Sequence, residues 1–139
     1  MNIEVRKYVD DDLDAVNEIL LECFSCTKNN FNDNCFTEIV VTTDNIVRGY
    51  LLLTKVLNPI KNKYYYLIDY VCVTSKYRGF GLSDELMKFA EELAREDNAI
   101  YLQLSCSRFR VGAHKLYERC GFIKRQSDIF RKVIEWLLI

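Results

Sequence analysis

The chain has 139 residues, half of them hydrophobic, and its nineteen basic and twenty acidic side chains give a net charge of −1. This length fits a single domain, residues 1–139, that buries a hydrophobic core without disulfide bonds. The near-neutral charge offers no basic surface for nucleic acid or an anionic membrane, and every apolar run is too short to cross a bilayer. The first six residues lack the basic and apolar segments of a signal peptide, so we expect a cytoplasmic protein.

The predicted elements follow from apolar residues at strand or helix spacing, with polar and glycine-containing turns between them. In chain order they are a strand at 3–8, a helix at 13–24, strands at 36–43, 46–56 and 64–74, a helix at 82–93, a strand at 100–106, a helix at 113–120, and strands at 122–126 and 129–134. The run 64–74 is almost wholly apolar, as expected for a central strand covered on both faces. This order predicts an α/β (α+β) fold, a mixed sheet with helices packed on it.

A glycine-containing turn lies between the strand 64–74 and the helix that follows, in Arg78-Gly79-Phe80-Gly81-Leu82-Ser83. The glycines allow close backbone approach to a ligand, the helix start directs free N–H groups toward it, and Arg78 adds a positive charge. This assembly suits a pyrophosphate, although an ordinary turn between a strand and a helix has the same pattern. Neither GxxxxGK[ST] nor a GxGxxG after the first strand is present, which argues against a nucleotide triphosphatase and a dinucleotide fold.

The loop at 78–83 resembles the acetyl-CoA loop of the GNAT superfamily of N-acetyltransferases, with Ser83 in place of the usual small apolar residue. The segment 68–79 looks like that family's fourth strand running into its loop. Residues 113–122, AHKLYERCGF, look like its A-x-x-x-Y-x-x-x-G-F segment. The two motifs occur in the family's order, and the resemblance covers about the whole chain.

The resemblance implies a mixed, mostly antiparallel sheet of six to seven strands flanked by about four helices, splayed between the fourth and fifth strands. It also implies an N-acetyltransferase that uses acetyl-CoA and no metal, and whose primary-amine acceptor, a small molecule or peptide, attacks directly in a ternary complex. A homodimer is compatible with it, whereas nucleic acid and membrane partners are not expected. The alternatives are transfer of another acyl group and a non-catalytic acyl-CoA-binding sensor of the same fold.

The resemblance places the cofactor on the fourth strand, the loop and one later arginine. The residues are Val71, Cys72, Val73, Arg78, Gly79, Phe80, Gly81, Leu82, Ser83 and Arg110. Val71 and Val73 would offer backbone groups to the pantetheine arm, which pairs like an added strand. Arg110 stands where many relatives carry asparagine. Asp84 and Glu85 in the first helical turn oppose a bound phosphate, so Arg78 should have to offset them.

The reaction needs a base for the amine and an acid for the departing thiolate. Tyr117 stands where the family places a tyrosine beside the cofactor sulfur, although its helical spacing equally fits a core residue. Asp69 is the candidate base, because a carboxylate within an apolar strand has a raised pKa; a carboxylate at a strand bulge is the alternative. His114, the one histidine, is expected to face solvent on its helix.

Six cysteines are present, and Cys23 and Cys26 have CxxC spacing at the end of the first predicted helix. Zinc would need a second ligand pair, and redox chemistry would favour a strand–helix junction, so we interpret them as buried structural thiols. Tyr64-Tyr65-Tyr66 and the loop 25–34 either shape the acceptor pocket or are ordinary strand aromatics and a solvated loop.

Overall fold

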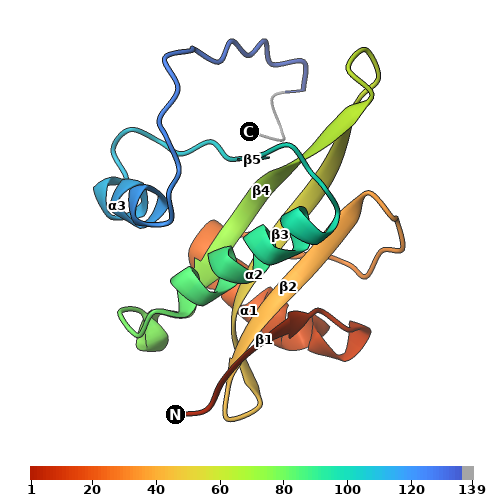
Figure 1. Ribbon diagram of the computed structural model, residues 1–139. Helices are drawn as coiled ribbons and strands as arrows, with labels where there is room; N and C mark the ends of the chain where they lie inside the picture. The colour runs from red at the N-terminus through yellow and green to blue at the C-terminus, as the bar shows by residue number, and fades with distance from the viewer. Residues whose placement is uncertain (136–139) are drawn as a thin grey trace.

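The computed structural model describes residues 1–135, and its centre is a five-stranded sheet in the order β1-β2-β3-β4-β5. The strands are β1 (Ile3–Lys7), β2 (Phe36–Thr43), β3 (Ile46–Asn58), β4 (Lys63–Val73) and β5 (Leu102–Gln103). The first four pair antiparallel, and β5 lies parallel to β4 (Figure 1). The predicted mixed, mostly antiparallel sheet is therefore confirmed.

Two helices cover opposite faces of this sheet, and a third lies beside it (Figure 1). They are α1 (Leu13–Phe24), α2 (Leu82–Glu96) and α3 (Val111–Arg119), with short 3-10 turns η1 (Asp10–Asp12) and η2 (Ser75–Tyr77) before α1 and α2. No helix within residues 1–135 combines the length and the apolar character needed to cross a membrane.

Each covering helix buries one apolar stripe, which is why the two helices pack where they do. On the α1 face the fully packed residues are Val16, Ile19, Leu20, Val40, Tyr50 and Cys72. On the α2 face they are Ile39, Val41, Leu51, Leu53, Tyr66, Ile68, Val73, Leu82, Leu86, Met87, Ala90 and Ala94. The larger cluster lies under α2, so this helix and the three strands β2, β3 and β4 form most of the core.

A β-bulge interrupts β4 at Tyr70. Tyr50 of β3 pairs with Cys72, but Leu52 pairs with Asp69, so two residues of β4 lie opposite one of β3. Tyr70 takes a left-handed backbone conformation with φ of 55°, which is uncommon for an aromatic residue and typical of functional sites. This bulge directly follows Asp69, as in the alternative that a carboxylate lies at a strand bulge.

The bulge changes which side chains share a face. Strict alternation would put Asp69 with Val71 on one face and Tyr70 with Cys72 on the other. Instead Val71 packs in the α2-face cluster and Cys72 in the α1-face cluster, while the Tyr70 ring meets Phe24 of α1 edge-on. Asp69, which precedes the bulge, alternates with the α2-facing Ile68 and so lies on the α1 face. Asp69 and Tyr70 therefore share that face.

The strands β3 and β4 approach closely beside the bulge. Gly49 is the β3 partner of Val73, and a Cβ on it would lie 2.7 Å from the Cys72 carbonyl oxygen and 2.8 Å from a Val41 methyl group. Real Cβ atoms do not come so near, so only glycine fits here.

β4 and β5 separate soon after they pair. Their register contains only Tyr66 with Leu102 and Leu67 with Gln103. Beyond Leu67, no strand among residues 1–135 pairs with this edge of β4. The expected splay between the fourth and fifth strands is therefore confirmed, and it leaves main-chain groups of β4 open.

The end of the chain differs from the prediction. The strand expected at 100–106 is reduced to β5, and the strands expected at 122–126 and 129–134 are wrong, because this segment has no regular structure up to residue 135. Its apolar side chains Ile123, Phe130 and Ile134 are 87%, 93% and 87% exposed. Strand-like alternation alone does not form a strand without a partner edge and a face to bury. The described residues hold five strands and three helices, fewer than expected.

Candidate functional site

The loop between η2 and α2 has the geometry of an anion-binding turn. Gly79 and Gly81 have φ of 85° and 80°, and Gly81 is the N-cap of α2. A Cβ at either glycine would meet no atom within 4 Å, so the space beside the loop is open. The first intrahelical bond runs from the Glu85 N–H to the Gly81 carbonyl, and glycine has no side chain to cap the N–H groups of residues 82–84. These donors and the helix dipole favour a negative group here.

Arg78 turns back from the loop toward the C-terminal end of α1. Its Nε donates to the Val73 carbonyl at 3.1 Å, and its Nη2 lies 3.4 Å from the Cys23 sulfur and 3.9 Å from Glu22 Oε1. The Glu22 carboxylate also accepts from the Ser75 N–H at 2.8 Å, which fixes the start of η2. The guanidinium is thus at the β4 end of the loop, with its side chain 58% exposed.

Asp84, in the first turn of α2, forms an ion pair with an arginine that the sequence analysis did not identify as a site residue. Arg119 of α3 holds the Asp84 carboxylate with two hydrogen bonds, both 3.0 Å, and this pairing raises the pKa of Arg119. The expectation was that Arg78 would offset Asp84. Arg119 does so instead, and the same contact ties α3 to the N-terminal end of α2. A sequence pattern gave no signal for it, because the two residues belong to different elements.

Tyr117 of α3 is half-buried against the α2-face cluster, with its ring 6.1 Å from that of Phe122. Burial raises the pKa of its hydroxyl, the nearby Cys106 thiol adds to the rise, and Arg110 opposes it. The group is therefore a protonated phenol at neutral pH. Both alternatives for this residue, packing and proton donation, are compatible with its position.

Asp69 and Tyr117 lie on different sides of the splayed edge of β4. Asp69 is exposed on the α1 face, so the expectation of a carboxylate desolvated among apolar strand residues is wrong. The bulge turns its neighbour Tyr70 onto the same face, where that ring is 47% exposed beside Phe24. A solvated carboxylate next to an exposed aromatic ring can attract a cationic amine.

Main-chain groups near the bulge face away from β3. The Thr74 N–H donates to the Arg48 carbonyl of β3 at 2.8 Å, whereas the Val73 carbonyl accepts from the Arg78 side chain. Alternation places the backbone groups of Val71 on the same side as those of Val73. Cys72 lies between them, with its side chain buried and, by the same alternation, its backbone groups directed toward its partner Tyr50 of β3.

Comparison with known proteins places this arrangement in a family. The sequence profile of the acetyltransferase (GNAT) family matches residues 2–122. The chain belongs to the GNAT acetyltransferase family. Membership in this GNAT family implies acyl transfer. The search of curated proteins found no match to the sequence.

Solved structures share the GNAT fold at low identity. A transcriptional regulator from Bacillus halodurans C-125 has a TM-score of 0.83 and 19% identity, over 95% of this chain and 100% of its own. Ribosomal-protein-alanine N-acetyltransferase from Brucella melitensis biovar Abortus 2308 has a TM-score of 0.78 and 18% identity, over 98% and 100%. Glucosamine-6-phosphate N-acetyltransferase from Arabidopsis thaliana has a TM-score of 0.78 and 16% identity, over 97% and 100%. At these identities the likeness shows the fold alone.

A buried polar cluster anchors the loop 25–34 of this GNAT chain to the sheet. Lys28 forms an ion pair with Glu38 at 3.1 Å, with only 11% and 8% of the two side chains exposed. Tyr50 donates to Glu38 at 2.7 Å, and the Lys28 ammonium donates to the Tyr8 hydroxyl at 3.2 Å. Asn17 of α1 bonds both main-chain groups of Lys28. The loop is thus held by buried charges rather than merely solvated, which its polar composition did not reveal.

Other predicted residues lie at the margin of this site. Arg110 is the exposed N-cap of α3. His114 is half-buried rather than solvent-facing, because its Nε2 lies 2.8 Å from the Ser107 carbonyl, and this contact links α3 to the preceding loop. Within residues 1–135, no group of three or more His, Cys, Asp or Glu side chains is arranged to hold a metal ion.

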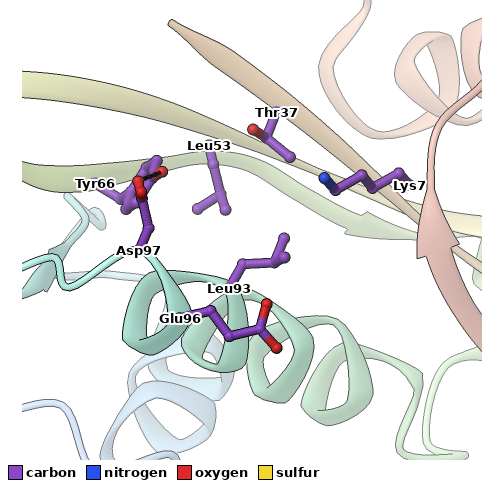
Figure 2. Close-up of a pocket in the computed structure, with 7 residues that line it drawn as sticks. All are labelled: Lys7, Thr37, Leu53, Tyr66, Leu93, Glu96 and Asp97. Atoms are coloured by element: carbon purple, nitrogen blue, oxygen red, sulfur yellow. Dashed lines mark hydrogen bonds between the residues drawn. The ribbon is translucent and has the colours of Figure 1, made fainter. Parts of the chain in front are cut away.

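A separate cavity of about 320 Å³ lies at the C-terminal end of α2, over the sheet (Figure 2). It is lined by Lys7, Thr37, Leu53, Tyr66, Leu93, Glu96 and Asp97. Asp97 at its edge is already held by Tyr66 and by Lys55 at 3.0 Å. Because α2 has 15 residues, this cavity is about 20 Å from the glycine loop and is not part of the loop's anion site.

Proposed function

We propose that this chain is a single-domain N-acetyltransferase that transfers the acetyl group of acetyl-CoA to a primary amine. The observation that carries the proposal is the open, uncapped turn at Gly79 and Gly81, followed immediately by a helix N-terminus and preceded by the splayed edge of β4. Membership in the GNAT family supports the same reading.

The residues present fit acetyl-CoA in two places. The N–H groups at the start of α2 would hold the pyrophosphate, since the glycines leave room for it and Arg119 neutralises Asp84. The backbone groups of Val71 and the Val73 N–H, which face away from β3, would hold the pantetheine arm in the manner of an added strand, while the Val73 carbonyl already accepts from Arg78. The bound cofactor supplies an activated acyl thioester. Arg78, Phe80 and Arg110 would border this path, and Arg78 would reach a phosphate only by leaving Cys23 or Glu22.

The chain's own residues then bring the amine and its protons into place. Asp69 on the α1 face would attract the ammonium form and take up its proton, directly or through water. Tyr117, whose raised pKa keeps the phenol protonated, would donate a proton toward the departing thiolate from the α2 face. The open edge of β4 between them is where the two groups would act on the same thioester.

The acceptor is a primary amine on a small molecule or a peptide. Three proteins of the same fold are named as acetyltransferases of a ribosomal-protein alanine, of glucosamine 6-phosphate and of an aminoglycoside. These acceptors belong to those proteins and do not identify the acceptor of this chain. In this chain the exposed Asp69 and Tyr70 present a carboxylate and an aromatic ring, which favour a cationic amine over an anionic or uncharged acceptor. The proposal includes no nucleic acid, membrane or metal.

The test combines acetyl-CoA calorimetry with a free-thiol release assay against an amine library. Gly81→Val should weaken acetyl-CoA binding at least about 100-fold, because it places a branched side chain at a φ of 80° in the space beside the loop. The matched control is Gly121→Val, since Gly121 has a φ of 90° and equally open surroundings but lies after α3. Binding unchanged in the Gly81 variant would refute the cofactor site. Binding without thiol release against any amine would instead identify an acyl-CoA sensor.

A further inference from the structure

Three of the six cysteines gather on the α1 face of the sheet, although they are far apart in the sequence. Cys23 and Cys26 lie at the C-terminal end of α1, and both pack against the cluster that contains the buried Cys72 of β4. All three are free thiols. The fold, rather than the CxxC spacing alone, brings a strand cysteine to this pair.

Cys23 differs from its two neighbours because a cation touches it. The Arg78 Nη2 lies 3.4 Å from its sulfur, and the thiol in turn lies 3.8 Å from the Val73 carbonyl. A guanidinium at hydrogen-bond distance stabilises a thiolate, which is the reactive form of cysteine. Cys23 is also only half-buried, so a small reagent can approach it.

Cys72 has the opposite environment. It is 5% exposed, and burial raises the pKa of its thiol, as do the neighbouring Cys23 and, to a lesser degree, Cys26. It is therefore a poor first nucleophile toward a reagent in solution. Cys23 nevertheless packs against the cluster that contains Cys72, so the Cys72 thiol lies on the same side of the sheet as a modified Cys23 sulfur.

We propose that Cys23 is a thiol-modification site that reacts with small-molecule disulfides and is resolved by Cys72 into an intramolecular Cys23–Cys72 disulfide. In the first step the Cys23 thiolate attacks one sulfur of a disulfide such as oxidised glutathione, forms a mixed disulfide and releases one thiolate. In the second, Cys72 loses its proton to water or the released thiolate and attacks the Cys23 sulfur, which expels the second thiolate. The two protein thiols are oxidised by two electrons, and the reagent disulfide is reduced by the same two.

This disulfide would act on the segment next to the glycine loop. It joins α1 covalently to β4 one residue before Val73, and it converts the thiol sulfur that Arg78 contacts into a disulfide sulfur. The inference concerns Cys23 and its neighbours and does not depend on the proposed acetyltransferase activity.

The experiment treats the purified full chain with oxidised glutathione and follows it by intact mass and by peptide mapping. We expect a loss of two hydrogens with no adduct retained, and a Cys23–Cys72 linked peptide that thiol reductants reverse. Cys72→Ala should stop at a glutathione adduct on Cys23, whereas Cys23→Ser should form neither product. Cys26→Ser is the matched control from the same CxxC pair and should still form the Cys23–Cys72 bond.

Two further variants distinguish this site from general thiol reactivity. Cys35 is the exposed cysteine of the set, and the Asp33 carboxylate raises the pKa of its thiol, so Cys35→Ser should leave the rate unchanged. Arg78→Gln removes the cation and should slow the reaction of Cys23 about tenfold. The proposal is overturned if the first adduct forms on Cys26 or Cys35, if the mapped disulfide is Cys23–Cys26, or if Arg78→Gln reacts at the original rate.

Discussion

Two parts of the molecule differ in what holds them together. Residues 3–97 contain every described side chain that is buried, including the almost fully enclosed Ile39, Leu51 and Leu86. Residues 98–135 contain none, since β5 has two residues and α3 packs with only half-buried side chains such as Tyr117. The second part is tied to the first by half-buried side chains such as Tyr117 and Phe122, by the short pairing of β5 with β4, and by the contact of Arg119 with Asp84.

The difference shows that stability and chemistry are drawn from different parts of this chain. The first part supplies the core and the cofactor loop, and the second supplies the candidate acid Tyr117 on a lightly packed helix. Segments with few buried contacts open more readily than the core. The two parts should therefore respond differently to substitution, and the following predictions test that separation.

The largest effect is expected in the core of the first part. Leu86→Ala should lower the free energy of unfolding by about 3 kcal/mol, because Leu86 is fully buried under α2 and truncation leaves a cavity. Ile123→Ala in the second part, where the side chain is 87% exposed, should change it by less than about 0.5 kcal/mol. Urea unfolding measures both, and equal losses would contradict the separation.

The second-largest effect is expected on turnover, from a substitution in residues 98–135. Tyr117→Phe should lower turnover about 10²-fold, or about 2.7 kcal/mol in the barrier, because it removes the proposed proton donor. Acetyl-CoA affinity and the unfolding midpoint should stay near those of the wild type, since the ring and its packing remain. Leu116→Val, a change on the same helix, is the control. A parallel loss of stability would mark Tyr117 as a packing residue instead.

A smaller effect on turnover is expected from a substitution in residues 3–97. Asp69→Asn should slow the reaction about tenfold at neutral pH and remove the acidic limb of the rate–pH profile, because the isosteric amide cannot accept the amine's proton. The effect is smaller than for Tyr117 because an exposed group can be replaced in part by water. If the profile is unchanged, ordered water is the base.

The smallest effect concerns stability in acid. Asp12 accepts two hydrogen bonds from Arg6, at 2.7 and 2.9 Å, which hold the pKa of its carboxyl below the usual value despite partial burial. A lowered folded-state pKa stabilises the protein above about pH 4, and this contribution is lost as the pH falls through the folded-state value. Asp12→Asn should therefore cost about 1 kcal/mol at pH 7 and progressively less in acid. Urea midpoints across that range measure it.

The parts of the fold that the sequence predicts correctly are those whose residue pattern lies within a single helix, hairpin or turn. The helices at 13–24 and 82–93 are recognisable because their apolar stripes repeat at helical spacing. The strands at 36–43 and 46–56 are predicted to form a hairpin because the two residues between them, Asp44 and Asn45, suit a tight turn, and both have positive φ in the structure. The glycine loop is recognisable because Gly79 and Gly81 stand between an apolar strand and the start of a helix, and both have positive φ in the structure. The last two strands were not predictable, because their alternation gives no sign of whether a partner edge is available.

The site was predictable only in its local components. Loop residues 78–83 are adjacent in sequence, so a motif identifies them. The pairing of Arg119 with Asp84, and of Lys28 with Glu38, joins separate elements and leaves no local pattern. The environment of Asp69 differs from the prediction for a related reason: an apolar strand implies burial, but Asp69 and Tyr70 are exposed at the bulge although Ile68 and Cys72 on either side are buried.

Gly49 lets β3 lie close to β4 beside the bulge, because it has no side chain. Any larger residue there would collide with the Cys72 carbonyl, whose position depends on the extra residue in β4. Loss of the bulge would in turn move that carbonyl and leave the space at Gly49 poorly filled. Among related sequences we therefore expect the two features to be gained or lost together, so that a side chain at position 49 accompanies a β4 one residue shorter.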